Sequence, residues 1–121
     1  MPDKDIRRIS SGGEYEQVAG YCRAVVAGGF VHVAGTVGPG ETTLDQCKNA
    51  LQIIETALKK AGSGFDKVVR VTYYLVDKAE FETCLPTLRD IFGQNPPAAT
   101  MIECRLIDDV HRIEIEVTAL A

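Results

Sequence analysis

Residues 113–119 alternate strictly between apolar side chains and side chains that are acidic or carry a hydroxyl. Successive side chains of a β-strand point to opposite faces of its sheet, so this alternation predicts a strand with one buried face. The predicted buried set is Ile113, Ile115, Val117 and Ala119. The set on the other face is Glu114, Glu116 and Thr118. A sheet that contains this strand needs a covering layer over its apolar side.

Two segments have the three- and four-residue periodicity of amphipathic helices and can supply that layer. The first begins at a pair spaced as a capping box, Thr43 and Gln46, and ends near Gly62. The second carries apolar residues at helical spacing from Phe81 to Phe92, after a capping signal at Asp77, and it stops before two consecutive prolines. We therefore expect two helices.

Five further segments are rich in β-branched residues or alternate in polarity, which predicts strands. They span residues 6–10, 23–26, 30–37, 68–76 and 98–106. The resulting order of elements predicts an α+β fold, a single mixed β-sheet with two helices on one face. A chain of 121 residues with 45% hydrophobic content has the usual size of one domain, so we expect residues 1–121 to form a single domain.

Alternation in the 68–76 segment predicts which of its side chains face the helices. Val69, Val71, Tyr73 and Leu75 form the expected helix-facing set. Arg70, Thr72 and Tyr74 are expected on the far face, together with His32, Met101 and Arg105. Such a mixture of aromatic, hydroxyl and charged groups suits contact with another subunit. A solvent-facing sheet with cross-strand ion pairs, such as Arg70 with Glu116, explains the same pattern, and both interpretations stay open.

The charge balance argues against nucleic acid and membrane partners. Thirteen basic and seventeen acidic side chains give a formal net charge of -4, so no overall field attracts nucleic acid or an anionic membrane. The first eight residues are polar, and no apolar run approaches the roughly 20 residues of a membrane span. We expect a cytoplasmic protein.

The cysteines and histidines show no pattern of a metal site. None of the four cysteines belongs to a C-x-x-C pair or has a histidine at metal-ligand spacing, and no dinucleotide or phosphate-loop motif is present, so we expect neither metal nor cofactor. Cys47 and Cys84 fall on apolar helix faces and are expected to be buried, whereas Cys22 is the candidate for reactivity. His32 in a strand and His111 in a polar turn are interpreted as structural or solvated.

Four short stretches, in this order, resemble the RidA/YjgF family, also described as endoribonuclease L-PSP-like. They are Tyr21-Cys22-Arg23-Ala24-Val25, Val33-Ala34-Gly35-Thr36, Asn95-Pro96-Pro97-Ala98-Ala99-Thr100 and the final alternating strand. The resemblance covers nearly the whole chain. It implies a chorismate-mutase-like fold assembled into a homotrimer, with a small-molecule cleft between each pair of subunits.

The active branch of this family hydrolyses reactive 2-imino acids, or their enamine tautomers, to 2-oxo acids and ammonia. Carried over by resemblance, Tyr21 is similar to a tyrosine of the cleft, and Met101 falls where a cysteine often lines it. Glu114 resembles the acid that positions or activates water. Ala99 stands where the family has an arginine that holds the substrate carboxylate, so the chain resembles a side branch that shares the Pro-Ala-Ala-Thr turn.

Loss of that arginine predicts a changed substrate range. Removing a charged hydrogen-bond partner costs about 1.5 to 3 kcal/mol, which is roughly a tenfold to a few hundredfold in affinity. Arg23 is the candidate replacement because, in an extended strand, it projects to the same side as Tyr21. A surface or interface ion pair is the other interpretation of Arg23, and a solvated or paired carboxylate is the other interpretation of Glu114.

The resemblance leaves two leading functions open. One is a divergent imine or enamine deaminase, a hydrolase that acts without a metal, and the other is a non-catalytic binder or sensor of a small molecule. In both cases the expected ligand carries a carbonyl or a carboxylate. RNA cleavage or inhibition of translation is the weakest interpretation, because the chain lacks a basic patch and an aromatic run for stacking on bases.

Overall fold

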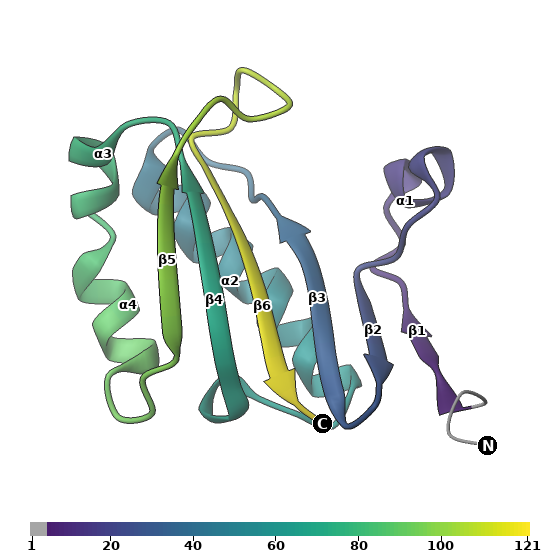
Figure 1. The fold of residues 1–121 in the computed structure, drawn as a ribbon. Coiled ribbons are helices and arrows are strands. Elements are labelled where there is room, and N and C mark those ends of the chain that lie inside the picture. Colours follow the sequence, from purple (N-terminus) through teal and green to yellow (C-terminus); the bar gives the residue numbers. More distant parts are fainter. Residues whose placement is uncertain (1–4) are drawn as a thin grey trace.

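The computed structural model describes residues 5–121, so the first residues of the polar N-terminal run and of the predicted domain lie outside the described part. Six strands form one sheet in the order β1-β2-β3-β6-β4-β5 (Figure 1). β4 and β5 are parallel and the other neighbours are antiparallel, so the sheet is mixed, as predicted. The strands are β1 (Arg7–Ile9), β2 (Ala24–Ala27), β3 (Phe30–Thr36), β4 (Val68–Leu75), β5 (Ala98–Glu103) and β6 (Ile113–Leu120).

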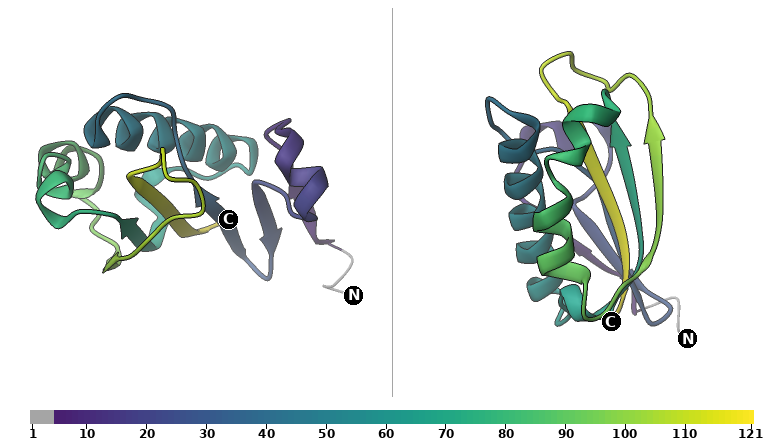
Figure 2. Two further views of the ribbon diagram at one scale, coloured as in Figure 1. Left: turned by 90° about the horizontal axis from the view of Figure 1, so that it is seen from above. Right: turned by 90° about the vertical axis from the view of Figure 1, so that its left-hand side faces the viewer.

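The helices pack on one face of this sheet and leave the other face bare (Figure 2). They are α1 (Glu14–Ala19), α2 (Thr43–Lys60), α3 (Lys78–Glu82) and α4 (Leu85–Phe92), with a short 3-10 turn η2 (Phe65–Lys67) before β4. α2 lies behind β3 and β6, whereas α3 and α4 flank β5. The α+β architecture with helices on one face is confirmed. Two details differ, because α1 was not predicted and the second predicted helix is divided into α3 and α4.

The alternation in β6 has the predicted consequence. Its four apolar residues, Ile113, Ile115, Val117 and Ala119, are all buried in the core. They pack in a single cluster with apolar residues of α2 such as Leu51, Ile54 and Leu58. The helix-facing layer therefore follows from the sequence pattern of these two elements.

One residue in β4 faces the opposite way from the prediction. Val71, Tyr73 and Leu75 are buried as expected, but Val69 is 41% exposed and Val68 is buried in its place. The register between β4 and β6 shifts between Val68 and Arg70, which leaves Val69 outside the ladder as a β-bulge. A bulge inserts one extra residue into the strand, so residues before it point to the face opposite to the one that simple alternation predicts.

β5 is shorter than predicted, and its side chains are placed differently. The strand ends at Glu103, so Arg105 lies beyond it. Met101 pairs with Tyr73, whose side chain is in the core, so Met101 lies on the helix side and not on the far face as predicted. It lines a groove together with Phe81 and Leu85.

The far face carries hydrogen bonds in place of the ion pair considered from the sequence. Arg70 Nη2 donates to Thr100 Oγ1 at 2.8 Å, and the Tyr74 hydroxyl donates to Glu116 Oε1 at 2.9 Å. Arg70 and Glu116 thus have separate partners. His32 pairs with Thr118 and is exposed on this face, as predicted.

The residue that caps α2 is one position earlier than the capping-box prediction. Thr42 accepts a hydrogen bond from the Asp45 backbone N–H at 3.1 Å, whereas Thr43 and Gln46 are buried. Asp77 caps α3 as predicted, by accepting from the Ala79 backbone N–H at 2.8 Å.

The division between α3 and α4 follows from the second residue of α4. Pro86 has no N–H to donate to the carbonyl four residues earlier, so one helix cannot continue through this point without losing that bond. Cys84 occupies the junction, and both Cys84 and Cys47 are fully buried, as predicted. Within residues 5–121, no helix has the length and apolarity that crossing a membrane requires.

Candidate functional site

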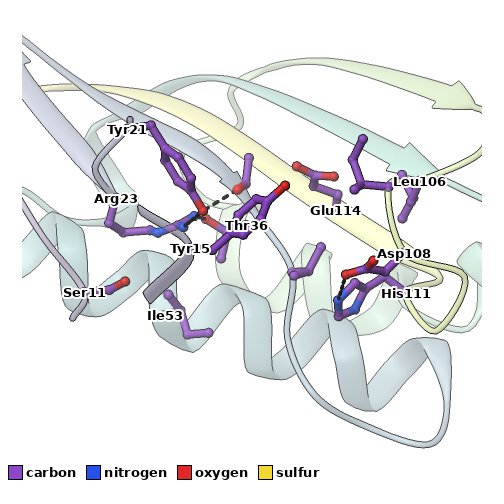
Figure 3. A pocket seen from close by; sticks show the side chains of 13 residues that line it. Ser11, Tyr15, Tyr21, Arg23, Thr36, Ile53, Leu106, Asp108, His111 and Glu114 are labelled. Atoms are coloured by element: carbon purple, nitrogen blue, oxygen red, sulfur yellow. Dashed lines mark hydrogen bonds and ion pairs between the residues drawn. The ribbon is translucent and has the colours of Figure 1, made fainter. Parts of the chain in front are cut away.

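A pocket of about 270 Å³ is lined in part by α1 and by the loop between β5 and β6, which lie at the same end of the sheet (Figures 1 and 3). Four parts of the chain supply most of its wall: the approach to β2, the end of β3, the start of β6 and the β5–β6 loop. The lining residues are Ser11, Tyr15, Tyr21, Arg23, Gly35, Thr36, Val37, Ile53, Leu106, Ile107, Asp108, His111 and Glu114. The pocket thus joins residues that lie about one hundred positions apart in the sequence.

Arg23 lies in the wall of this pocket and is only 9% exposed. Its Nη1 donates to the Gly35 carbonyl and to Thr36 Oγ1, both at 2.9 Å, and its Nη2 donates to the Tyr21 hydroxyl at 3.2 Å. The guanidinium carbon also lies 5.4 Å from the centre of the Tyr21 ring, within the range of a cation–π interaction. Tyr21 and Arg23 are therefore adjacent, as the strand parity predicted.

The carboxylates of Glu16 and Glu114 are near enough to interact with the charge of this guanidinium, but neither contacts it directly. Among the described residues it forms no ion pair with a carboxylate, and its buried Nε has no hydrogen-bond partner. Three of its five N–H donors are used, all by neutral oxygens. A buried cation held only by neutral groups is costly, and it favours an anion in the adjoining pocket.

The shape of β3 near its end makes room for the acid of the site. The register between β3 and β6 shifts between Val33 and Thr36. Gly35 lies in this irregular stretch, and a Cβ there would collide with the Glu114 carboxylate. The same glycine offers its carbonyl to Arg23. The absence of a side chain at Gly35 thus leaves Glu114 in its present place, next to a carbonyl that binds Arg23.

Glu114 is half-buried beside that glycine. Burial raises the pKa of its carboxyl, and the nearby charge of Glu116 raises it further, whereas His111 and Arg23 oppose the shift. A carboxyl group with a raised pKa exchanges protons more readily near neutral pH, which is what general acid–base catalysis requires.

Ala99 and Met101 do not line this pocket. Both lie on β5, which is one edge of the sheet, whereas Tyr21 and Arg23 adjoin β2 near the other edge. Met101 instead lines the groove against α3 and α4. The structure therefore brings together Tyr21, Arg23 and Glu114, but not the other two predicted site residues.

Several pocket residues were not predicted from the sequence as site residues. Tyr15 comes from α1, and Leu106, Ile107 and Asp108 come from the β5–β6 loop. His111, interpreted as structural or solvated, lies in the pocket wall, with its Nε2 4.0 Å from Asp108 Oδ2 (Figure 3). Its place three residues before Glu114, in the loop just before β6, is the sequence signal that could have indicated this position. In residues 5–121, no three His, Cys, Asp or Glu side chains are grouped so that they could hold a metal ion.

The chain is similar to proteins of one family over almost its whole length. The family model described as Endoribonuclease L-PSP matches residues 13–121. The RutC family protein UK114 of Drosophila melanogaster is 32% identical over 120 residues, which cover 93% of this chain and 87% of that protein. The 2-iminobutanoate/2-iminopropanoate deaminase of Homo sapiens is 30% identical over 124 residues, which cover 95% of this chain and 90% of that protein.

The fold matches a solved structure equally well. The crystal structure of Rv2704 from Mycobacterium tuberculosis, a member of the YjgF/YER057c/UK114 family, superposes with a TM-score of 0.93 and 36% sequence identity. The match covers 97% of this chain and all of that one. The chain therefore belongs to the Endoribonuclease L-PSP family, which is the RidA/YjgF family that its sequence motifs resemble.

Proposed function

We propose that the pocket binds a small carboxylate-bearing molecule and that the protein is a divergent imine or enamine deaminase of altered substrate range. One observation carries the proposal: the buried Arg23 guanidinium forms no ion pair with a carboxylate of the described residues, and it shares a pocket with Glu114, whose pKa is raised. The first group suits the anionic end of a ligand, and the second suits proton transfer at its reactive centre.

A carboxylate in the pocket would supply what Arg23 lacks. One N–H of Nη2 is free of protein partners in the described structure and can donate a charge-assisted hydrogen bond to a carboxylate, whereas the unpaired Nε is buried. Thr36 and Tyr21 hold the rest of the guanidinium in place. The pocket volume of about 270 Å³ suits a metabolite of amino-acid size.

The reaction would be hydrolysis of a carbon–nitrogen double bond. A water molecule attacks the imine carbon while Glu114 takes a proton from that water. The imine nitrogen gains a proton as the carbon–nitrogen double bond becomes a single bond. The resulting carbinolamine then releases ammonia and forms the carbonyl. An enamine enters the same route after its carbon is protonated to give the imine. The name of the human relative, 2-iminobutanoate/2-iminopropanoate deaminase, supports this reaction class.

We propose a homotrimer as the working form. Large apolar side chains of the pocket, Tyr15 and Ile107, are exposed, as are their neighbours Val18 on α1 and Val110 in the β5–β6 loop, and Ile107 is 87% exposed. A neighbouring subunit would cover these side chains and the bare sheet face, and the family resemblance implies that it contributes the edge with Ala99 and Met101 to the cleft. An alanine at that position leaves Arg23 as the cation for the ligand.

A binder or sensor without turnover is the second candidate. Its support is that three donors of Arg23 are already engaged and that Ala99 offers no charge, so the usual substrate would be held less firmly. RNA cleavage, which the family description names, is a weaker candidate because the net charge of -4 opposes an RNA partner.

Ammonia release separates these candidates. Imines are generated in place from a panel of amino acids by an amino-acid oxidase, and ammonia formation is followed with and without the protein. A deaminase accelerates release from at least one imine, Glu114→Gln removes the acceleration, and Arg23→Gln weakens it chiefly through KM. Arg89→Gln on the exposed side of α4 is the matched control. Acceleration that survives Glu114→Gln contradicts the proposed mechanism.

A further inference from the structure

The β5–β6 loop is fastened to α2 by a single buried amide. Gln46 is only 4% exposed, and its Nε2 donates to the Val110 carbonyl at 2.9 Å and to the Gly40 carbonyl at 3.2 Å. Its Oε1 accepts from the Arg112 backbone N–H at 2.7 Å. The Gln46 amide therefore forms hydrogen bonds with Val110 and Arg112, the residues on either side of His111.

A second tether fixes the same end of the loop to α3. The Arg112 side chain forms a two-pronged ion pair with Glu80, with Nε–Oε1 and Nη2–Oε2 distances of 2.9 and 2.8 Å. Thr43 Oγ1 also donates to Glu80 Oε1 at 2.7 Å. With its neighbours held in this way, the backbone of His111 has little freedom, and its ring is directed by the chain toward the pocket wall.

The imidazole faces charged groups from each side of the pocket. Asp108 of the same loop lies 4.0 Å from Nε2, Glu114 projects from β6, and Arg23 lies toward the other end (Figure 3). From α2 the facing groups are Gln46 and Ile53, which are uncharged. The buried Nδ1 has no partner among the described residues. Because Nδ1 is buried, Nε2 is the ring nitrogen that can exchange a proton with a ligand in the pocket.

We infer that His111 is a second proton-exchanging group of the pocket and that Gln46 is the positioning residue that holds it there. This inference rests on the proposed imine hydrolysis, which needs two proton transfers in each step. In the first step a C–O bond forms, Glu114 takes a proton from water, and the imidazolium of His111 gives one to nitrogen. In the second step the C–N bond breaks, Glu114 returns its proton to nitrogen, and the hydroxyl proton passes to His111. Ammonia leaves, and both groups regain their starting states.

Nitrogen-15 NMR of the imidazole rings tests the inference directly, because the chain contains only two histidines. His32 lies on the far sheet face and serves as the internal reference. The probe is 2-oxobutanoate, a product-type 2-oxo acid. Titration is expected to shift the His111 ring resonances and to leave those of His32 in place.

The role of Gln46 is tested with and without the probe. Gln46→Met keeps the side-chain length but removes all three hydrogen bonds, so the His111 resonances should broaden or move before any ligand is added. In Gln46→Met, kcat is expected to fall roughly tenfold and KM to stay within about twofold of the parent value. In His111→Asn, kcat is expected to fall roughly a hundredfold. Gln46→Glu retains only the oxygen that accepts from the Arg112 backbone N–H, so its kcat should lie between that of Gln46→Met and that of the parent. Asn49→Ala removes a hydrogen bond that a side-chain amide of the same helix donates to the Pro39 carbonyl, not to the β5–β6 loop, and is the matched control.

Three outcomes would overturn the inference, and they differ from one another. If Gln46→Met leaves the His111 resonances unchanged while thermal unfolding shows a folded protein, Gln46 does not position the ring. If 2-oxobutanoate binds in an Arg23-dependent way without moving the His111 resonances, the role of His111 is wrong and the proposed site stands. If 2-oxobutanoate does not bind the parent at millimolar concentration, the proposed function fails, and the inference fails with it.

Discussion

Gly35 is the residue on which the geometry of the candidate site depends most directly. Its missing Cβ leaves space for the Glu114 carboxylate, and its carbonyl accepts from Arg23. Gly35→Ala is expected to displace the carboxylate and lower the free energy of unfolding by about 1 kcal/mol, because the flexible acid can move aside. Urea unfolding measures this cost. In a Glu114→Ala background the same change should cost nothing measurable, and an equal cost there would show that the carboxylate is not the obstacle.

Glu114 also makes a prediction about pH. Burial raises the pKa of its carboxyl, so between the ordinary pKa and the raised one the folded chain binds more protons than the unfolded chain. The contribution of this group to stability is therefore present at low pH and is lost as the pH rises through that window. Glu114→Gln should raise the free energy of unfolding at pH 7, and the difference should vanish toward pH 4.

Urea titrations of parent and variant at several pH values measure that difference. Glu82→Gln, at an exposed position on α3, is the control for loss of one negative charge. A stabilisation by Glu114→Gln that stays constant from pH 4 to pH 7 would mean that the carboxyl is not perturbed by its surroundings.

At the scale of single elements, the bulge in β4 gives a matched pair of substitutions. Val68 is buried and Val69 is not, although they are neighbours of identical chemistry. Val68→Ala should cost about 2 kcal/mol through lost burial and a residual cavity, and Val69→Ala less than about 0.5 kcal/mol. Chemical denaturation at one protein concentration compares them. A larger cost at Val69 would place the bulge elsewhere and restore the simple alternation.

This pair also shows how far sequence patterns predict the fold. The burial of β6 and α2 could be predicted, because an uninterrupted period of two or of three and four residues has one structural solution. The bulge at Val69 could not, since it depends on how β4 pairs with a strand that follows some forty residues later. α1 escaped prediction because it has six residues and only Glu16 is buried, so it has no apolar stripe.

The candidate site was predictable to a similar extent. Tyr21 and Arg23 are two positions apart in an extended segment, so their adjacency follows from local geometry. His111 reaches the pocket through the contacts of Gln46 with a loop 64 residues away, and no local pattern encodes that contact. The capping-box prediction was wrong for a similar reason. Thr43 and Gln46 form hydrogen bonds with residues distant in the sequence, and local spacing does not encode those contacts.

At the scale of the whole molecule, assembly is the property with the widest consequences. The bare sheet face favours contact with another subunit and the family resemblance implies a homotrimer, so light scattering at micromolar concentration should give about three times the chain mass of 13.1 kDa. Thr72→Arg on the bare face should reduce that mass, whereas Arg89→Glu on the helix side should not. A parent protein that remains a monomer would remove the proposed intersubunit cleft.

The affinity of the pocket for a carboxylate tests the central claim most directly. Calorimetric titration with 2-oxobutanoate should show binding to the parent and to Arg89→Gln. Arg23→Lys keeps the charge but loses the planar fork, and Arg23→Gln loses both, so affinity should fall in that order. Loss of the charged contact in Arg23→Gln is expected to cost about 1.5 to 3 kcal/mol, at least a tenfold weakening. Equal affinity in the parent and in a folded Arg23→Gln variant would contradict the account.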